Sequence, residues 1–506
     1  MGRGHFMAGM QGVMSLHSRL EQQSYAEASR RRADAREREM RNAKPSNVYG
    51  DGRLGAQGDA EQLGLFDTSG LYVGGIEGRL AFFGGDGHLL TYARTGSGKG
   101  RDLILPNLAH LRGRSLVVVD VKDGENAFAS RHHRSETLGE RCIYLNPFGL
   151  QGLPNARINP LQGLVDRVAR GEQIDTQADE IAHILLPPQP KDTNSWVRPG
   201  ARRLLATRME YLAHFDPARC TLAGLWEFVN AYSLGADLAM MMDCGLPGIE
   251  GKAGGFLSAQ NEAPKQFEAY KEDAIAALAS FEPGKTLAAS TAANDFDFGA
   301  LKTAPHTVYL IAPSEKLEAV APWVSLVLNH AIEAIAGTRG PLRTTFLLDE
   351  FPQLPPAPAI MKALRLYRGK GIQLWFYAQG RFSLEGRWSR EAVKEFEDQA
   401  SLMNFVAVEE PELLRDIEKW SGNETVLLHG VNHSGGVVEA AGANLGEGRR
   451  SVLQSEGIRA VGAGRQIIKI AGWPHLFVCD RPPFYAVAPW SQQIRDVRKL
   501  HSGEEN

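Results

Sequence analysis

The chain has few cysteines and no long apolar run, and each shortage excludes a class of protein. Its 506 residues include only four cysteines, without paired short spacing, which argues against a zinc site and a disulfide framework. The longest apolar runs, such as 115–121 and 323–328, fall far short of the roughly 20 residues that span a bilayer. The N-terminus lacks the apolar block of a signal peptide. We therefore expect a cytoplasmic protein, peripheral at an inner membrane only through partners.

The charge balance also lacks an excess of either sign. A net charge of −3 gives no global basic field, so any contact with DNA must come from local patches or from the interior of a ring. A hydrophobic content of 43% and 23% charged residues are typical of a globular chain, and the length predicts two or three domains. Residues 1–62 are polar and Arg-rich. We interpret them as a solvated tail, or alternatively as an arm that contacts DNA, anionic lipid or another subunit.

Hydrophobic periodicity predicts an α/β core that is interrupted by helices. Short apolar strands alternate with helix-compatible stretches before about residue 160 and again after about 284, which is typical of a mostly parallel sheet with covering helices. Between them the apolar residues recur at helical spacing. The predicted domains are a tail (1–62), an α/β nucleotide-binding domain in two segments (63–160 and 284–495), an all-α insertion (161–283) and a C-terminal tail (496–506).

A glycine-rich loop follows the apolar strand that includes Leu89 and Leu90. Gly96 and Gly98 let backbone amides approach an anion, and Lys99 adds a charge at the β- and γ-phosphate oxygens. The helix that begins near Lys99 directs further amides at the phosphate. The loop therefore predicts an ATP site whose nucleotide-binding residues are Thr95, Gly96, Ser97, Gly98, Lys99, Gly100 and Arg101.

Two positions of this loop depart from the general phosphate-loop pattern. Ala93 replaces the first glycine, which a backbone of ordinary φ tolerates. Gly100 stands where the pattern has a Ser or Thr hydroxyl that binds Mg²⁺. Either the metal is held by Asp349, water and the nucleotide, or another hydroxyl substitutes, or the site does not hydrolyse.

Two acidic residues end the apolar strand Thr345–Leu348 far downstream. We expect Asp349 to hold Mg²⁺ through water and Glu350 to polarise the attacking water. The two halves of one site, each on the expected kind of element, favour an ATP-driven machine.

Two further residues are candidates for catalysis. Gln379 ends the next strand, where its amide can hydrogen-bond the γ-phosphate or the water. Arg368 lies between the acidic strand and the glutamine strand, and it is a candidate in-trans arginine finger, with Arg365 and Lys370 as competing choices.

Two other polar groups are less specific. The segment Asp120–Asn126 follows a strand, where ligation, loop structure and a helix cap are equally good explanations. The pair His132 and His133 has no third ligand in view and is expected at the surface.

In these residues, the chain resembles the type IV coupling proteins of the TraG-like conjugative transfer family. The family's loop commonly has glycine in place of the hydroxyl residue, as at Gly100. The other similar segments occur in the family's order: 105–108, 118–126, 146–149, 158–161, 295–297, 307–313, 347–352, 378–379 and 480–483. The resemblance covers about residues 68–490. Typical members carry two N-terminal membrane-spanning helices, which this sequence lacks.

The resemblance implies a RecA-like P-loop ATPase core with an all-α domain, working as a hexameric ring with ATP and Mg²⁺. Such a motor recruits a DNA–relaxase complex or a protein effector, binds DNA without sequence preference and pumps its substrate into a type IV secretion channel. Two alternatives remain. One alternative is a nucleotide-gated receptor scaffold for secreted proteins, and the other is a DNA-packaging or chromosome-segregation pump of the same superfamily.

Overall fold

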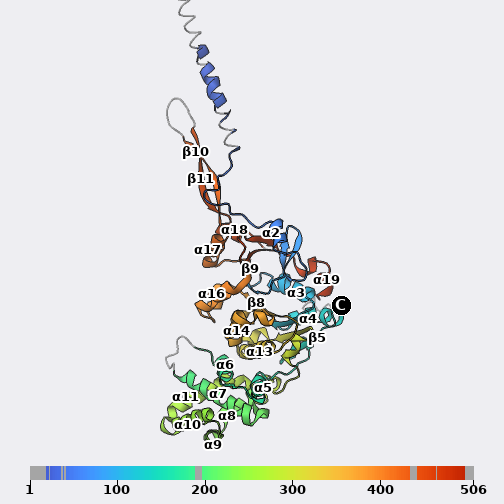
Figure 1. The fold of residues 1–506 in the computed structure, drawn as a ribbon, viewed down its shortest axis with the longest axis vertical. Coiled ribbons are helices and arrows are strands. Elements are labelled where there is room, and N and C mark those ends of the chain that lie inside the picture. Colours follow the sequence, from blue (N-terminus) through green and yellow to red (C-terminus); the bar gives the residue numbers. More distant parts are fainter. Residues whose placement is uncertain are drawn as a thin grey trace, which may run out of the picture. The chain divides into compact units, whose positions relative to one another are not determined.

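Two compact units make up the chain in the computed structural model. It describes all residues except 1–18, 22, 33, 36–37, 39–41, 189–195, 433–441, 463 and 496–506. The larger unit comprises Leu54–Ile417 and Ser455–Asn506, and the smaller one Met1–Arg53 and Glu418–Gln454 (Figure 1). The predicted C-terminal tail, 496–506, lies outside the described residues, as do residues 1–18 of the predicted N-terminal tail.

The larger unit is built on an 11-stranded sheet. Seven neighbouring strands, from β9 to β5, are parallel, and the other four extend the sheet antiparallel from β9. The predicted α/β class with a mostly parallel sheet is thus confirmed. In spatial order the strands are β2 (Arg79–Phe83), β1 (Leu71–Ile76), β13 (Phe477–Asp480), β12 (Arg465–Ile470), β9 (Ala400–Val406), β3 (His88–Ala93), β8 (Ile372–Ala378), β7 (Thr344–Leu348), β4 (Ser115–Asp120), β6 (His306–Ile311) and β5 (Arg141–Leu145).

Helices cover both faces of this sheet, which explains why its central strands are buried throughout and mostly apolar. Every residue of β3, β4, β6, β7 and β8 is buried, as expected for parallel strands between two helical layers. One layer contains α3 (Leu105–His110), α4 (Glu125–His132) and α19 (Trp490–Gln493). The other contains α13 (Leu317–Gly337), α14 (Pro358–Leu366), α15 (Arg381–Glu385) and α16 (Arg390–Gln399).

The chain between β5 and β6 is helical, and Figure 1 draws most of it in green. Helix α7 packs against α5, α6, α10 and α11, and α5 and α6 contact α13 of the sheet layer. Ion pairs from Lys362 to Glu180 (2.8 Å) and from Arg167 to Glu333 (3.3 Å) join the two parts. The helices are α5 (Gln162–Ala169), α6 (Asp175–Leu185), α7 (Val197–Phe215), α8 (Leu222–Asn230), α9 (Leu234–Met242), α10 (Pro247–Glu262), α11 (Pro264–Leu278) and α12 (Thr286–Ser290).

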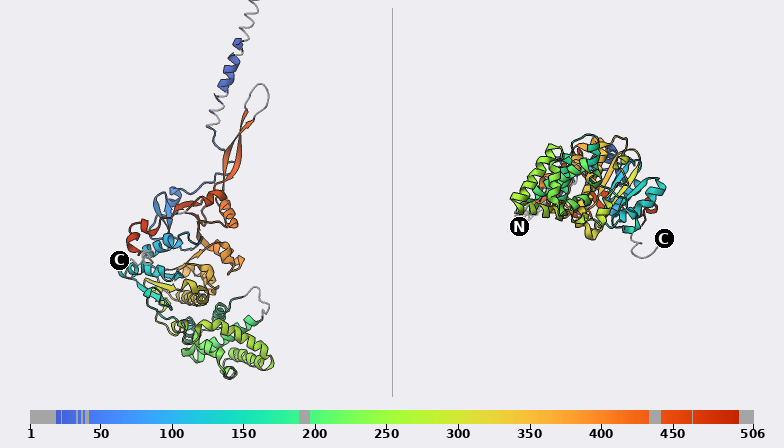
Figure 2. Two further views of the ribbon diagram at one scale, coloured as in Figure 1. Left: turned by 180° about the vertical axis from the view of Figure 1, so that it is seen from behind. Right: turned by 90° about the horizontal axis from the view of Figure 1, so that it is seen from below.

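The smaller unit is an antiparallel hairpin of β10 (Asn423–Asn432) and β11 (Gly442–Ser451), visible from behind in Figure 2. Backbone hydrogen bonds from Gly52 to Asn423 (2.8 Å) and from Thr425 to Gly50 (3.1 Å) attach the N-terminal segment to β10. The contacts therefore divide the chain differently from the predicted boundaries. Residues 418–454 group with the N-terminal segment, and α2 (Gln57–Gln62) belongs to the larger unit.

One helix among the described residues, Ser314–Gly337, is long and apolar enough to cross a bilayer. Its unbroken apolar runs, such as 323–328, are short because polar residues interrupt them. The residues of its most apolar window are 67% buried inside the protein, where α13 packs on the sheet and on α14.

Candidate functional site: a phosphate loop facing two carboxylates

The candidate site lies at the carboxyl edge of the parallel strands. The glycine-rich loop follows β3, Asp349 and Glu350 follow β7, and Gln379 follows β8. Because β3, β8 and β7 are neighbours and parallel, their carboxyl ends meet at one edge. This topology brings together residues that are about 250 positions apart, such as Lys99 and Glu350.

The loop has the backbone that its glycines predict. Gly96 and Gly98 have φ values of 75° and 86°, a region that side chains disfavour. A Cβ on Gly98 would also lie only 2.8 Å from the Asp102 carboxylate. Instead of the uniform helix expected after the loop, a single π-helical turn, Gly100–Ile104, precedes α3.

Lys99 lies between the two acidic residues. Its ammonium is 3.0 Å from Asp349 Oδ1 and also forms an ion pair with Glu350. The side chains of Lys99 and Asp349 are only 5% and 1% exposed. Burial opposes the charge on Lys99, but the two carboxylates outweigh it and raise the pKa of the lysine. Burial likewise opposes the charge on Asp349, and the ammonium groups of Lys99 and Lys122 lower the pKa of that carboxyl.

Glu350 is held in a strained conformation at the end of β7. Its φ of 50° is unusual for a residue with a side chain. Gln379 donates from Nε2 to Glu350 Oε2 at 3.2 Å, and the Glu350 amide donates to Asp349 Oδ1 at 3.0 Å. Lys99, Asp349, Glu350 and Gln379 are thus one connected cluster.

The turn after β4 adds Lys122, which belongs to the segment Asp120–Asn126 that the sequence did not assign to the site. Lys122 Nζ lies 3.2 Å from Asp349 Oδ2. Asp120, at the end of the same strand, is buried and accepts hydrogen bonds from the Ala127 amide (2.9 Å) and from Asn126 Nδ2 (3.3 Å). Burial raises the pKa of Asp120 to about 7. The loop and cap explanation of Asp120 therefore fits, whereas Lys122 faces the site.

A second charged cluster supports the loop from behind. The Asp102 side chain is fully buried and forms an ion pair with Arg101 and another, at 3.3 Å, with Arg481 Nη1. Arg481 directly follows β13 and is 2% exposed. Only the segment 480–483, noted for its resemblance to the family's last strand, pointed to this residue.

Arg368 does not reach this cluster within one chain. It lies in the turn Tyr367–Lys370 before β8, at the opposite edge of the sheet from Gln379. No hydrogen bond or ion pair joins its side chain to the described residues, whereas the Arg365 side chain is bound to Glu395 of its own chain at 2.7 Å.

A cavity of about 330 Å³ opens over the loop. Lys99, Lys122 and Glu350 line one part of it, and the aromatic rings of Phe484 and Tyr485 line another. The loop residues that line it are Thr95, Gly96, Gly98, Gly100 and Arg101; Ser97 is absent from its lining.

The donor set suits Mg²⁺ when a nucleotide supplies the remaining ligands. Asp349 Oδ2 is buried and accepts no well-formed hydrogen bond; among the described residues its ion-pair contact is Lys122 Nζ at 3.2 Å, so the oxygen can still bind a metal or its water. Among the described residues, no group of three or more His, Cys, Asp or Glu side chains could hold an ion alone. Of the predicted ligands, Asp349 is the protein group in position.

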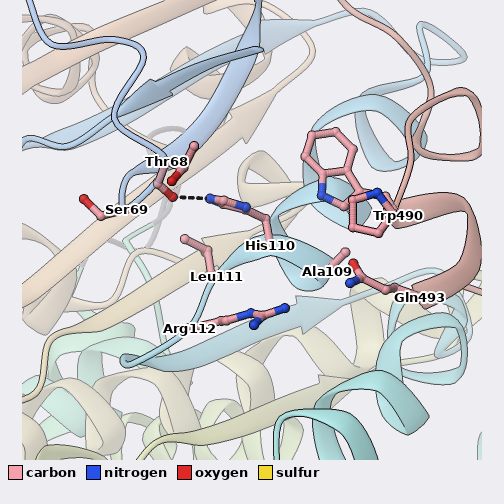
Figure 3. A pocket seen from close by; sticks show the side chains of 9 residues that line it. Thr68, Ser69, Ala109, His110, Leu111, Arg112, Trp490 and Gln493 are labelled. Carbon is pink, nitrogen blue, oxygen red and sulfur yellow. Dashed lines mark hydrogen bonds between the residues drawn. The ribbon is translucent and has the colours of Figure 1, made fainter.

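A larger cavity, of about 450 Å³, lies at the other end of α3 (Figure 3). It has no phosphate loop or carboxylate, and His110 is already bonded to the Thr68 carbonyl at 2.6 Å. We therefore assign no chemistry to it. Nearby, His133 is buried and bonded to the Ala109 carbonyl at 2.9 Å, so the expectation that it lies at the surface is wrong.

Comparisons with known proteins agree with this arrangement. A family model described as type IV secretory system conjugative DNA transfer matches residues 35–497. VirD4 of Rhizobium rhizogenes is 23% identical over 409 residues, which cover 77% of this chain and 57% of VirD4. Escherichia coli TraG, a conjugal transfer protein, is 23% identical over 483 residues, which cover 83% of this chain and 72% of TraG.

The solved structures show the fold. The plasmid coupling protein TrwB, bound to a non-hydrolysable ATP analogue, has a TM-score of 0.62 at 15% identity, over 87% of this chain and 96% of that one. TrwB with ADP and Mg²⁺ gives 0.61 at 15% identity, over 85% and 93%. The predicted RecA-like fold is therefore confirmed. The family match spans most of the sequence, so this chain belongs to the type IV secretory system conjugative DNA transfer family.

Proposed function

We propose that this chain is an ATP-driven coupling protein, which recruits a DNA–relaxase or protein substrate and pumps it into a type IV secretion channel. The observation that carries the proposal is Lys99 placed between Asp349 and Glu350 beneath a cavity lined by the glycine-rich loop. The similarity to TraG and to TrwB, whose structures contain nucleotides, supports the same conclusion.

The cluster suggests how the residues divide the work. In the ligand-free site the carboxylates neutralise Lys99, and triphosphate oxygens replace them as its partners when a nucleotide binds. Glu350 is then released to orient a water and accept its proton. The side-chain amide of Gln379 remains within hydrogen-bonding reach of Glu350 and of that water. Mg²⁺ held at Asp349 would neutralise phosphate charge.

We further propose that the motor is a homo-oligomeric ring, a hexamer as the family resemblance implies, in which Arg368 serves the neighbouring subunit. Its place at the opposite edge of the sheet from the loop leaves it no role in its own site. Basic side chains that line such a ring would bind DNA phosphates without sequence preference. We propose that the motor works on the cytoplasmic side, where ATP and DNA are available, and that its partners make the contact with the membrane.

ATP turnover with and without single-stranded DNA tests the proposal. We expect DNA to stimulate turnover, and Lys99→Ala to abolish it because the phosphate charge loses its buried partner. Lys285→Ala is the matched control, since Lys285 is 51% exposed and paired with Glu282 in the helical segment. Nucleotide binding without turnover in the wild-type chain would instead support a receptor scaffold and contradict the motor.

A further inference from the structure

The ammonium of Lys122 lies close to the position where the general phosphate loop has a Ser or Thr hydroxyl. Gly100 provides no side chain to ligate Mg²⁺. A Cβ built on Gly100 would have a single side-chain neighbour within 4 Å, the ammonium of Lys122 at 3.8 Å. The space that a Ser or Thr hydroxyl would occupy is therefore next to the ammonium of Lys122, in the turn after β4.

The backbone holds Lys122 in this place. The turn after it contains Asp123 and Gly124, both with left-handed φ values of 56° and 81°. The Glu125 amide closes the turn on the Lys122 carbonyl at 3.1 Å. The Asp123 carboxylate accepts the amide and the hydroxyl of Ser314 at 3.0 Å and 2.8 Å. The bonds at the Lys122 carbonyl and at Asp123 thus hold the backbone of Lys122, and its side chain is left to adjust.

The charges around Lys122 suit a phosphate. Its side chain is 38% exposed and lines the cavity, while its ammonium lies 3.2 Å from Asp349 Oδ2. Together with Lys99 it places two ammonium groups against one buried carboxylate. An ammonium has no lone pair and cannot ligate a metal, but it donates strongly to phosphate oxygens.

We propose that Lys122 is a second phosphate-binding lysine, which takes over the contact that a hydroxyl-bound metal makes in other phosphate loops. The inference rests on the nucleotide site proposed above. Its consequence is that the chain binds a nucleoside triphosphate well without Mg²⁺, and that the metal serves chemistry more than affinity.

Equilibrium binding of a fluorescent ATP analogue, in Mg²⁺ and in EDTA, tests this role. The wild-type affinity should fall less than about tenfold in EDTA. Lys122→Gln should lose about tenfold to a hundredfold in EDTA, the effect of one charge-assisted hydrogen bond, and clearly less in Mg²⁺. Lys122→Arg should keep most of the metal-free binding, and Lys285→Ala should match the wild type under both conditions. Thermal melting of each variant checks folding.

Restoring the hydroxyl gives a second, independent measurement. Gly100→Ser in the Lys122→Gln background should recover affinity in Mg²⁺ and not in EDTA, because a hydroxyl acts through the metal. Equal losses for Lys122→Gln in both buffers, or no loss in either, would overturn the inference. Wild-type binding that is tight in Mg²⁺ and absent in EDTA would also overturn it while leaving the nucleotide site intact. No binding in either buffer would refute the proposed function itself.

Discussion

Two variants that are inactive alone should recover ATP turnover when they are mixed. Within one chain, Lys99 and Arg368 lie at opposite edges of the sheet. The seven-residue strand β8 separates Arg368 from Gln379, and at about 3.3 Å per residue it spans roughly 20 Å. An arginine at that distance does not reach the site of its own chain, and we proposed above that it serves a neighbouring subunit. We therefore predict that Lys99→Ala and Arg368→Ala complement each other.

The size of the recovery follows from the geometry. If Arg368 acts as proposed above, a complete site needs Lys99 from one subunit and Arg368 from its neighbour. If equal amounts of the two variants assemble at random, about a quarter of the interfaces combine both intact residues. Each variant alone has none, and loss of an arginine finger costs about a thousandfold or more in turnover. The mixture should thus reach about a quarter of the wild-type rate.

The assay is steady-state ATP turnover in the presence of single-stranded DNA, after the two variants have been unfolded and refolded together or co-expressed. Arg365→Ala is the control, because Arg365 is bound to Glu395 of its own chain and should affect turnover only weakly. A mixture no faster than the mean of its two components would refute the shared site. An active Arg368→Ala would exclude the residue altogether.

Three further predictions concern the groups around the loop. Burial raises the pKa of Asp120 to about 7, well above its unfolded value of about 3.9. The folded state therefore keeps a proton that the unfolded state has lost, and the free energy of unfolding should fall as the pH rises from about 4 to 7. Asp120→Asn should remove that slope in ligand-free melting curves. Arg481→Met should lower the free energy of unfolding by about 2–3 kcal/mol in urea denaturation, because it leaves Asp102 with one cation. In an Asp102→Asn background the same substitution should cost less. Additive losses in the double variant would contradict this pairing. Tyr485→Ala should weaken ATP binding about fivefold to a hundredfold through lost stacking. Tyr485→Phe should bind ATP as the wild type does, because it keeps the ring. If Tyr485→Ala lost tripolyphosphate binding to the same extent, stacking on the base would be excluded.

The local chemistry of the site could be predicted before the fold was known. Gly96, Gly98 and Lys99 form a phosphate loop because of what their own backbone and side chains permit. The strand before Asp349 is buried at every position because both of its faces are covered, and its apolar run Phe346–Leu348 marks its end in the sequence. The parallel strands and the helices between β5 and β6 were readable for the same reason.

The hairpin was not readable. The strand β11 includes Gly442, Gly446 and Gly448, and glycine disfavours strands unless a partner pairs with the backbone. β11 pairs with β10 close by in the sequence, but the backbone bonds of Gly50 and Gly52 to β10 join segments about 370 residues apart. No local pattern in either segment records such a contact.

The sequence by itself determined which chemical groups are available: an anion-binding loop, two carboxylates at a strand end, and no hydroxyl at position 100. Only the tertiary structure decided which of them meet. The order of the parallel strands placed Lys122 against Asp349 and beside Gly100, and it put Arg368 at the far edge of the sheet. The physical reason is that strand order sets which loops share an edge, and hydrophobic periodicity reports burial but not neighbours.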